Sequence, residues 1–91
     1  MADLCSSEDS PWGVLLLNDD HTPMEFVVYA IEQFFDRDRE SATHLMLRTH
    51  NEGIVECGIY SREMAKTKAA QMIALARKHG HPLQCVIERK P

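Results

Sequence analysis

The chain lacks the features that mark exported, membrane-embedded and disulfide-stapled proteins. It has three cysteines in 91 residues and no C-x-x-C pair, so neither a disulfide framework nor a four-cysteine zinc site is supported. No apolar run approaches the roughly 20 residues that cross a bilayer, and the first residues show no basic start followed by an apolar segment. We therefore expect a cytoplasmic protein with reduced thiols and no membrane partner.

An excess of positive charge is also missing. Ten Lys and Arg residues stand against 14 Asp and Glu residues, which gives a net charge of -4 at pH 7. Surfaces that bind nucleic acid usually carry a basic stripe, so we expect no nucleic-acid partner. The sequence has no Gly-rich phosphate loop and no G-x-S-x-G nucleophile elbow, so it gives no sign of catalysis or of a cofactor.

What is present is the composition of one small domain. Hydrophobic residues make up 44% of the chain and charged residues 26%, which leaves room for one modest core. Residues 1–11 are mostly small, polar and acidic, so they predict a flexible N-terminal tail. From Trp12 the pattern becomes hydrophobic, and we expect a single domain over residues 12–91.

Hydrophobic periodicity predicts strands and helices in alternation. An almost wholly apolar run predicts a strand over 12–17 that is covered on both faces. The next element is a helix with Thr22 as its N-cap and Pro23 at its first position. Its apolar stripe has a period of 3.6 residues and consists of Met24, Val27, Val28, Ile31, Phe34 and Phe35.

The rest of the domain continues this alternation. A second helix is predicted from about Arg39 to His50, with Gly53 as its stop signal. A strand follows over 53–60, whose two glycines allow a bulge or a close backbone approach. The last elements are a helix from a cap at Ser61 to about residue 79, and a strand over 82–88. The order β-α-α-β-α-β predicts a small α+β domain with a three-stranded antiparallel sheet covered by helices.

Asn18, Asp19 and Asp20 come directly after the first predicted strand. Asn and Asp in such a position most often form turns or caps. Because Thr22 is already expected to cap the helix, the two carboxylates exceed what capping needs, and they could bind an ammonium group or a metal ion. The calcium-binding pattern D-x-[DN]-x-[DN]-G is absent, so metal is the weaker alternative.

The other polar candidates have ordinary explanations beside functional ones. His50 follows Met46 by one helical turn, so both side chains point to the same side, although a histidine near a helix end is most often a favourable C-terminal charge. His79, His81 and Cys85 do not have a recognised zinc spacing, so we expect no metal site. The last helix has a charged face that is either solvated or a docking surface, made up of Glu63, Lys66 and Lys68.

Five short motifs follow one another along the chain. They are residues 18–27 (NDDHTPMEFV), 46–50 (MLRTH), 57–58 (CG), 63–68 (EMAKTK) and 81–85 (HPLQC). Together they resemble the bacterial ClpS adaptor family over about residues 12–90. This resemblance implies a monomeric, non-enzymatic adaptor of the bacterial N-end rule. Such an adaptor captures proteins with a free N-terminal Leu, Phe, Tyr or Trp and delivers them to the ClpAP protease.

The resemblance also implies roles for individual residues. The α-amino group of the ligand would be bound by Asn18, Asp19, Asp20 and His50. A hydrophobic pocket for the first side chain would be lined by Thr22, Pro23, Met24, Val27, Met46, Thr49 and Leu83. The N-terminal domain of the ClpA unfoldase would dock on Tyr60, Glu63 and Lys68. No metal or other cofactor is implied.

The chain departs from the family at His21, where an aromatic residue such as Tyr is common, and at Thr49, where Val is common. Both departures bear on which first side chain is preferred, and the N-terminal tail is short for a family whose extension assists delivery. The principal alternative is an interaction module resembling the C-terminal domain of the ribosomal stalk protein, with no preference for peptide N-termini. A small acid/base enzyme built on Asp19 or Asp20 with His50 is more remote, because no nucleophile or cofactor site accompanies them.

Overall fold

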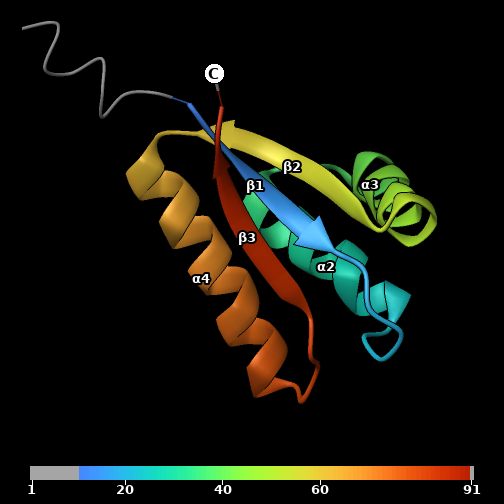
Figure 1. Ribbon diagram of the computed structural model, residues 1–91. Helices are drawn as coiled ribbons and strands as arrows, with labels where there is room; N and C mark the ends of the chain where they lie inside the picture. The colour runs from blue at the N-terminus through green and yellow to red at the C-terminus, as the bar shows by residue number, and fades with distance from the viewer. Residues whose placement is uncertain (1–10, 91) are drawn as a thin grey trace, which may run out of the picture.

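In the computed structural model, which describes residues 11–90, the chain adopts the predicted α+β fold. The elements are β1 (Trp12–Leu17), α2 (Met24–Phe35), α3 (Arg39–Glu52), β2 (Ile54–Tyr60), α4 (Arg62–Lys78) and β3 (Gln84–Arg89). The sheet is antiparallel, with β1 in the centre between β2 and β3 (Figure 1). Residues 1–10, which form most of the predicted flexible tail, lie outside the described residues.

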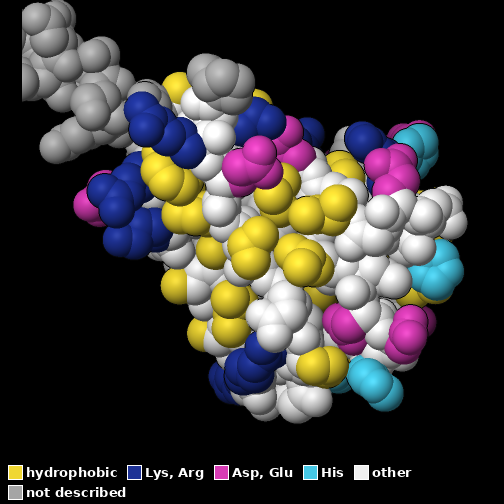
Figure 2. Space-filling view, viewed as in Figure 1, with side chains coloured by type: hydrophobic (Ala, Val, Ile, Leu, Met, Phe, Trp, Pro, Cys, Tyr) yellow, Lys and Arg dark blue, Asp and Glu magenta, His cyan; other side chains and the backbone are white. Residues whose placement is uncertain are grey.

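The central strand β1 supplies the middle of the core. Its alternate side chains Val14 and Leu16 are both 0% exposed, on the face that packs against the helices. The prediction that both faces of this strand are covered is wrong, because Leu15 and Leu17 on the other face are only partly buried. The opposite face of the sheet is open, and Figure 2 shows hydrophobic side chains gathered over the three strands there. Ile54, Ile59 and Val86 on these strands are roughly half exposed.

The pairing of β1 with β2 contains one irregularity. Val14 lies opposite Gly58 and Leu15 lies opposite Glu56, so Cys57 is the extra residue of a bulge. A Cβ atom on Gly58 would lie 2.7 Å from the ring of Tyr60. The predicted bulge is thus present beside Gly58, whereas Gly53 lies before the strand, at the end of the preceding helix.

The prediction that Thr22 caps the first helix is wrong. Pro23 is the N-cap of α2, with extended backbone angles, and no side chain caps this end of the helix. The Pro23 carbonyl accepts hydrogen bonds from the N–H groups of Phe26 and Val27. Pro suits a helix start because its φ is fixed near −65° and it has no N–H to leave unpaired. Thr22 belongs instead to the preceding loop.

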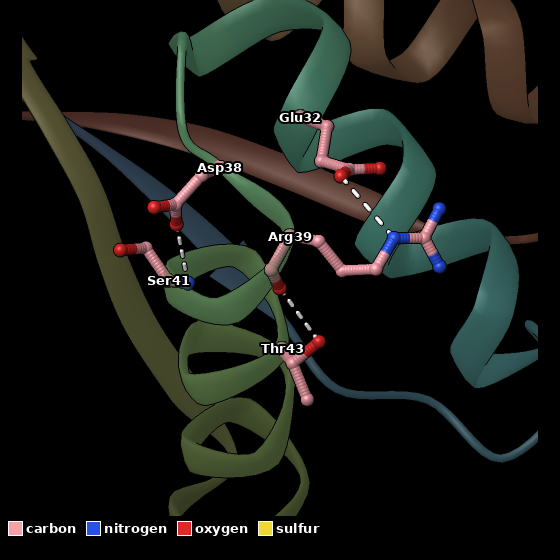
Figure 3. A network of polar contacts seen from close by, with 5 residues as sticks. All are labelled: Glu32, Asp38, Arg39, Ser41 and Thr43. Carbon is pink, nitrogen blue, oxygen red and sulfur yellow. Dashed lines mark hydrogen bonds and ion pairs between the residues drawn. The ribbon is translucent and has the colours of Figure 1, made fainter.

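A short corner leads from α2 into α3. Asp36 ends α2 in the left-handed region, at φ 53°. Asp38 then caps α3 by accepting a hydrogen bond from the N–H of Ser41 at 2.8 Å. Arg39 reaches back to Glu32 on α2, with 3.5 Å between Nε and Oε2 (Figure 3). The Arg39–Glu32 ion pair therefore connects α3 to α2.

The end of α3 is bonded to the end of β1. Gly53 closes the helix at φ 87°, which glycine adopts without strain, and its N–H donates to the Thr49 carbonyl at 2.8 Å. The Gly53 carbonyl in turn accepts from the N–H of Asn18 at 2.9 Å. The helix extends to Glu52, beyond the predicted end at His50. This arrangement brings Asn18 beside the last turn of α3.

The predicted cap of α4 is confirmed, because the Ser61 hydroxyl accepts from the N–H of Met64 at 3.2 Å. At the other end of the helix, Nη1 of Arg77 donates to the carbonyls of His81 and Leu83 at 2.8 and 2.9 Å. These bonds hold the segment that returns the chain into β3. Within residues 11–90, no helix is both long enough and apolar enough to cross a membrane.

Cys57 and Cys85 are free thiols buried in the sheet. Burial raises the pKa of each to about 12, and for Cys57 the nearby Cys85 adds to this effect. Both thiols therefore stay protonated at physiological pH and are poor nucleophiles. Cys5 lies outside the described residues.

Candidate functional site

A cavity of about 260 Å³ opens where β1 ends, beside the start of α2 and the end of α3. Segments far apart in the sequence contribute to it. Its lining residues are Leu17, Asn18, Asp19, Asp20, Thr22, Met24, Val27, Met46, Thr49, His50 and Leu83. The fold therefore brings the acidic loop after β1 together with α3 and with the segment that precedes β3.

The cavity has a polar mouth and an apolar interior. Asn18, Asp20 and His50 are exposed, whereas Val27 is 8% exposed and Leu83 is 1% exposed. In Figure 2, acidic and histidine side chains gather on the side of the molecule where Figure 1 draws α2 and α3. A ligand with a polar cationic end and an apolar side chain matches this gradient.

Asp19 organises the loop at the mouth. Its Oδ1 accepts hydrogen bonds from the N–H groups of His21 and Thr22 at 2.8 and 2.7 Å, and its Oδ2 accepts from the Thr22 hydroxyl at 2.8 Å. Burial alone would raise the pKa of Asp19, but these hydrogen bonds outweigh burial and hold the pKa below its usual value. The carboxylate is thus ionised at neutral pH. The turn-forming role that is common for Asp in this position is present in this loop.

Thr49 and His50 are neighbours on α3 with different surroundings. Thr49 is 4% exposed, and its hydroxyl donates to the Leu45 carbonyl at 2.8 Å. That bond uses the only donor of the side chain, so Thr49 has no free donor to offer a ligand. His50 is exposed at the mouth, where its imidazole is accessible to a ligand.

The cavity lining contains every residue predicted for the ligand site except Pro23. Pro23 is exposed and acts as the N-cap of α2, so it determines where the helix begins. The structure adds Leu17, the last residue of β1. The sequence contained a signal for Leu17, because it directly precedes Asn18.

The residues predicted for docking lie together at the opposite end of β1. Tyr60 pairs with Trp12, at the start of that strand. The Nζ atom of Lys68 lies 5.6 Å from the centre of the Tyr60 ring, and Glu63 is exposed in the first turn of α4. Burial is the main cause that raises the pKa of Tyr60, so its phenol is neutral at physiological pH.

No group of His, Cys, Asp and Glu side chains among residues 11–90 is arranged to hold a metal ion. His79 and His81 instead flank Phe26, with ring centroids 5.6 and 4.6 Å from that of the phenylalanine.

The sequence matches a family of protease adaptors. Residues 7–86 match the family described as ATP-dependent Clp protease adaptor protein ClpS, and the chain belongs to this family. It is a non-catalytic adaptor of the Clp protease.

Similar proteins come from several bacteria. The ATP-dependent Clp protease adapter protein ClpS of Hyphomonas neptunium is 55% identical over 85 residues, covering 93% of this chain and 72% of that protein. The corresponding protein of Phenylobacterium zucineum is 59% identical over 78 residues, covering 86% of this chain and 72% of that protein. Among solved structures, Agrobacterium tumefaciens ClpS2 bound to L-phenylalaninamide aligns with a TM-score of 0.88 at 30% identity, covering 90% of this chain and 99% of that one.

Proposed function

We propose that the chain is an N-end rule adaptor. It binds proteins whose free N-terminal residue is Leu, Phe, Tyr or Trp and delivers them to the ClpAP protease. The observation that carries this proposal is the cavity with a polar mouth and an apolar interior. Its volume of about 260 Å³ is below the roughly 300–1,000 Å³ of pockets for drug-sized ligands, so it suits one side chain better than a longer segment.

The mouth of the cavity has acceptors for a protonated amine. An α-ammonium group has three N–H donors, and each needs a partner when the group is partly buried. Asn18, Asp20 and a neutral His50 can each supply an acceptor. Asp19 already accepts three hydrogen bonds within the loop, but carboxylate oxygens have about four acceptor positions in all. Asp19 therefore adds negative charge and can still accept from the ligand.

The interior of the cavity suits a large apolar side chain. Val27, Met46 and Leu83 are buried around it, while Met24 is 47% exposed at its edge. Methionine is flexible enough to adjust to side chains of different shape. This combination favours a pocket that accepts both aliphatic and aromatic first residues.

The solved relative supports the same ligand chemistry. L-phenylalaninamide, the compound bound to Agrobacterium tumefaciens ClpS2, combines a free α-amine with an aromatic side chain. A charge-assisted hydrogen bond contributes roughly 1.5–3 kcal/mol, and burial of one large apolar side chain about the same. After the entropy of association is subtracted, we expect dissociation constants in the micromolar range.

Delivery requires a second surface. We assign it to Tyr60, Glu63 and Lys68, which would contact the N-terminal domain of the ClpA unfoldase. These residues cluster at the start of β1, whereas the cavity is at its end. A substrate held in the cavity would therefore leave the docking surface free.

The test is a set of fluorescent peptides that differ only at the first residue, measured by fluorescence anisotropy. Peptides that begin with Leu, Phe, Tyr or Trp should bind, and peptides that begin with Ala, Glu or Lys should not. Acetylation of the first amine should abolish binding, because it removes both the charge and the donors. Equal binding of free and acetylated peptides would overturn the proposal and favour an interaction module without N-terminal recognition.

A further inference from the structure

A second concavity lies beside the first and has a different chemistry. It is an open groove lined by His21, Arg77, Gly80, His81 and Pro82. No carboxylate lines this groove, although the chain as a whole has a net charge of -4. We call it the His21–Arg77 groove.

The groove and the cavity share one wall. In the loop after β1, Asp20 and Thr22 line the cavity while His21, between them, lines the groove. In the segment before β3, Leu83 lines the cavity while the preceding Pro82 lines the groove. Neighbouring residues of the same two segments therefore border both depressions.

Arg77 supplies a permanent positive charge that is held in place. Its Nη1 donates to the carbonyls of His81 and Leu83 at 2.8 and 2.9 Å. Within residues 11–90, Nε and Nη2 of Arg77 make no hydrogen bond or ion pair, and the residue is exposed. The guanidinium therefore offers further N–H donors to the solvent side of the groove.

The two histidines flank this charge. His81 is half-buried, and its ring packs edge-on against Phe26 with centroids 4.6 Å apart. Its backbone N–H donates to the Ala76 carbonyl at 2.8 Å. His21 is exposed, and its backbone N–H donates to the Asp19 carboxylate. Each imidazole can donate a hydrogen bond when neutral and carries positive charge when protonated.

We propose that the His21–Arg77 groove binds the side-chain carboxylate of an acidic residue close behind the N-terminal residue of the substrate. This inference rests on the proposed function, because the occupant is the continuation of the peptide whose first residue fills the cavity. An extended chain advances about 3.3 Å per residue, so positions two to four of the peptide can pass the shared wall. The substrate would then place its positive ammonium group at the acidic mouth and its negative carboxylate in the basic groove, so that each charge meets an opposite one.

The test uses peptides that begin with Phe and carry Asp at position two, three or four, each paired with a peptide that has Asn at the same position. Anisotropy at low ionic strength should give about 1.5- to fivefold tighter binding for Asp than for Asn at one of these positions, the range expected for an exposed ion pair. His21→Ala should reduce this ratio and His21→Asp should invert it. Lys78→Ala is the matched control, because Lys78 is exposed at the same helix end but does not line the groove.

The outcomes separate the two proposals. If the Asn peptides bind but Asp gives no advantage at any of the three positions, the groove does not take a carboxylate, while N-terminal recognition stands. If the Asp advantage survives unchanged in His21→Asp, the carboxylate is bound elsewhere and the assignment is overturned. If no peptide with a free N-terminal Phe binds, both the proposed function and this inference fail.

Discussion

The carboxylate of Asp19 holds Thr22 by two bonds: Oδ1 accepts from its backbone N–H at 2.7 Å, and Oδ2 accepts from its hydroxyl at 2.8 Å. This pair closes the loop between β1 and α2, and both residues line the cavity. Thr22 thus belongs to this loop, and Pro23 is the N-cap of α2. The shape of the cavity mouth thus depends on one ionised side chain.

Asp19→Asn should weaken both the loop and peptide binding. The amide cannot accept from the Thr22 hydroxyl through its nitrogen and has no charge, so we expect roughly tenfold weaker binding or more, as for a lost charge-assisted hydrogen bond. Thr22→Val is the matched variant, because it removes only the hydroxyl partner and should cost less. Anisotropy with a Phe-first peptide measures both variants, and equal affinity of Asp19→Asn and the wild type would contradict this role.

The same carboxylate predicts a pH-dependent stability. The pKa of Asp19 is lower in the folded chain than its usual value of 3.8, so its contribution is present above that value and is lost as the pH falls through the folded pKa. The free energy of unfolding of the wild type should exceed that of Asp19→Asn at pH 7, and the difference should shrink below about pH 4. Urea denaturation at several pH values measures it. A difference that stays constant down to pH 3 would contradict the assignment.

Thr49→Val should leave peptide affinity and first-residue preference nearly unchanged. The Thr49 hydroxyl is bonded to the Leu45 carbonyl within α3, so the ligand meets a side chain that already behaves like valine in size and shape. We expect dissociation constants within about twofold of the wild type for Leu and Phe peptides, since no ligand hydrogen bond is lost. Thr49→Ala is the contrasting variant, because it enlarges the cavity. A changed Leu-to-Phe ratio in Thr49→Val would show that the hydroxyl contributes to selectivity.

Much of the fold was predictable because the signals were local and repeated. The apolar run over β1, the capping serine of α4 and the glycine that ends α3 each specify an element from adjacent residues. The predicted Thr22 cap was wrong because the Thr22 side chain bonds to Asp19 within the loop, and a sequence pattern does not show which neighbouring group a hydroxyl pairs with.

The candidate site was predictable only through the family resemblance. Periodicity places Leu83 on a strand face and Met46 on a helix stripe, but it does not bring either of them to Asn18. That meeting depends on tertiary contacts such as the bond between Asn18 and Gly53 and those of Arg77 with the segment before β3. The His21–Arg77 groove likewise needs the fold, because His21 precedes Arg77 by more than 50 positions in the chain.

Leu83→Ala should affect stability and binding together. Leu83 is 1% exposed and borders the cavity, so truncation should destabilise the fold by about 2–5 kcal/mol and widen the cavity. Leu83→Met, which nearly conserves volume, should cost less than about 1.5 kcal/mol and retain Phe binding. Val86→Ala, at a position 43% exposed on the neighbouring strand, is the control and should change peptide affinity little. Chemical denaturation and anisotropy on the same samples distinguish loss of fold from loss of the pocket.

The separation of the two surfaces along β1 predicts that docking and recognition can be disrupted independently. Glu63→Arg and Lys68→Glu reverse charges beside Tyr60 at the start of the strand, about 17 Å of extended chain from the cavity. Each should weaken binding to the isolated N-terminal domain of ClpA at least tenfold, as for a lost interfacial charge pair, and leave the affinity for Phe-first peptides within twofold.

Lys78→Glu provides the matched control for this charge reversal, because Lys78 is exposed in the last turn of the same helix, far from Tyr60 along its length. It should retain binding to the ClpA domain, which excludes a general effect of net charge. Calorimetry with that domain and anisotropy with the peptide measure the two affinities. If Glu63→Arg and Lys68→Glu left docking intact, the unfoldase would have to contact another face. If these two charge reversals also abolished peptide binding, the docking surface and the cavity would not be independent, despite their separation along β1.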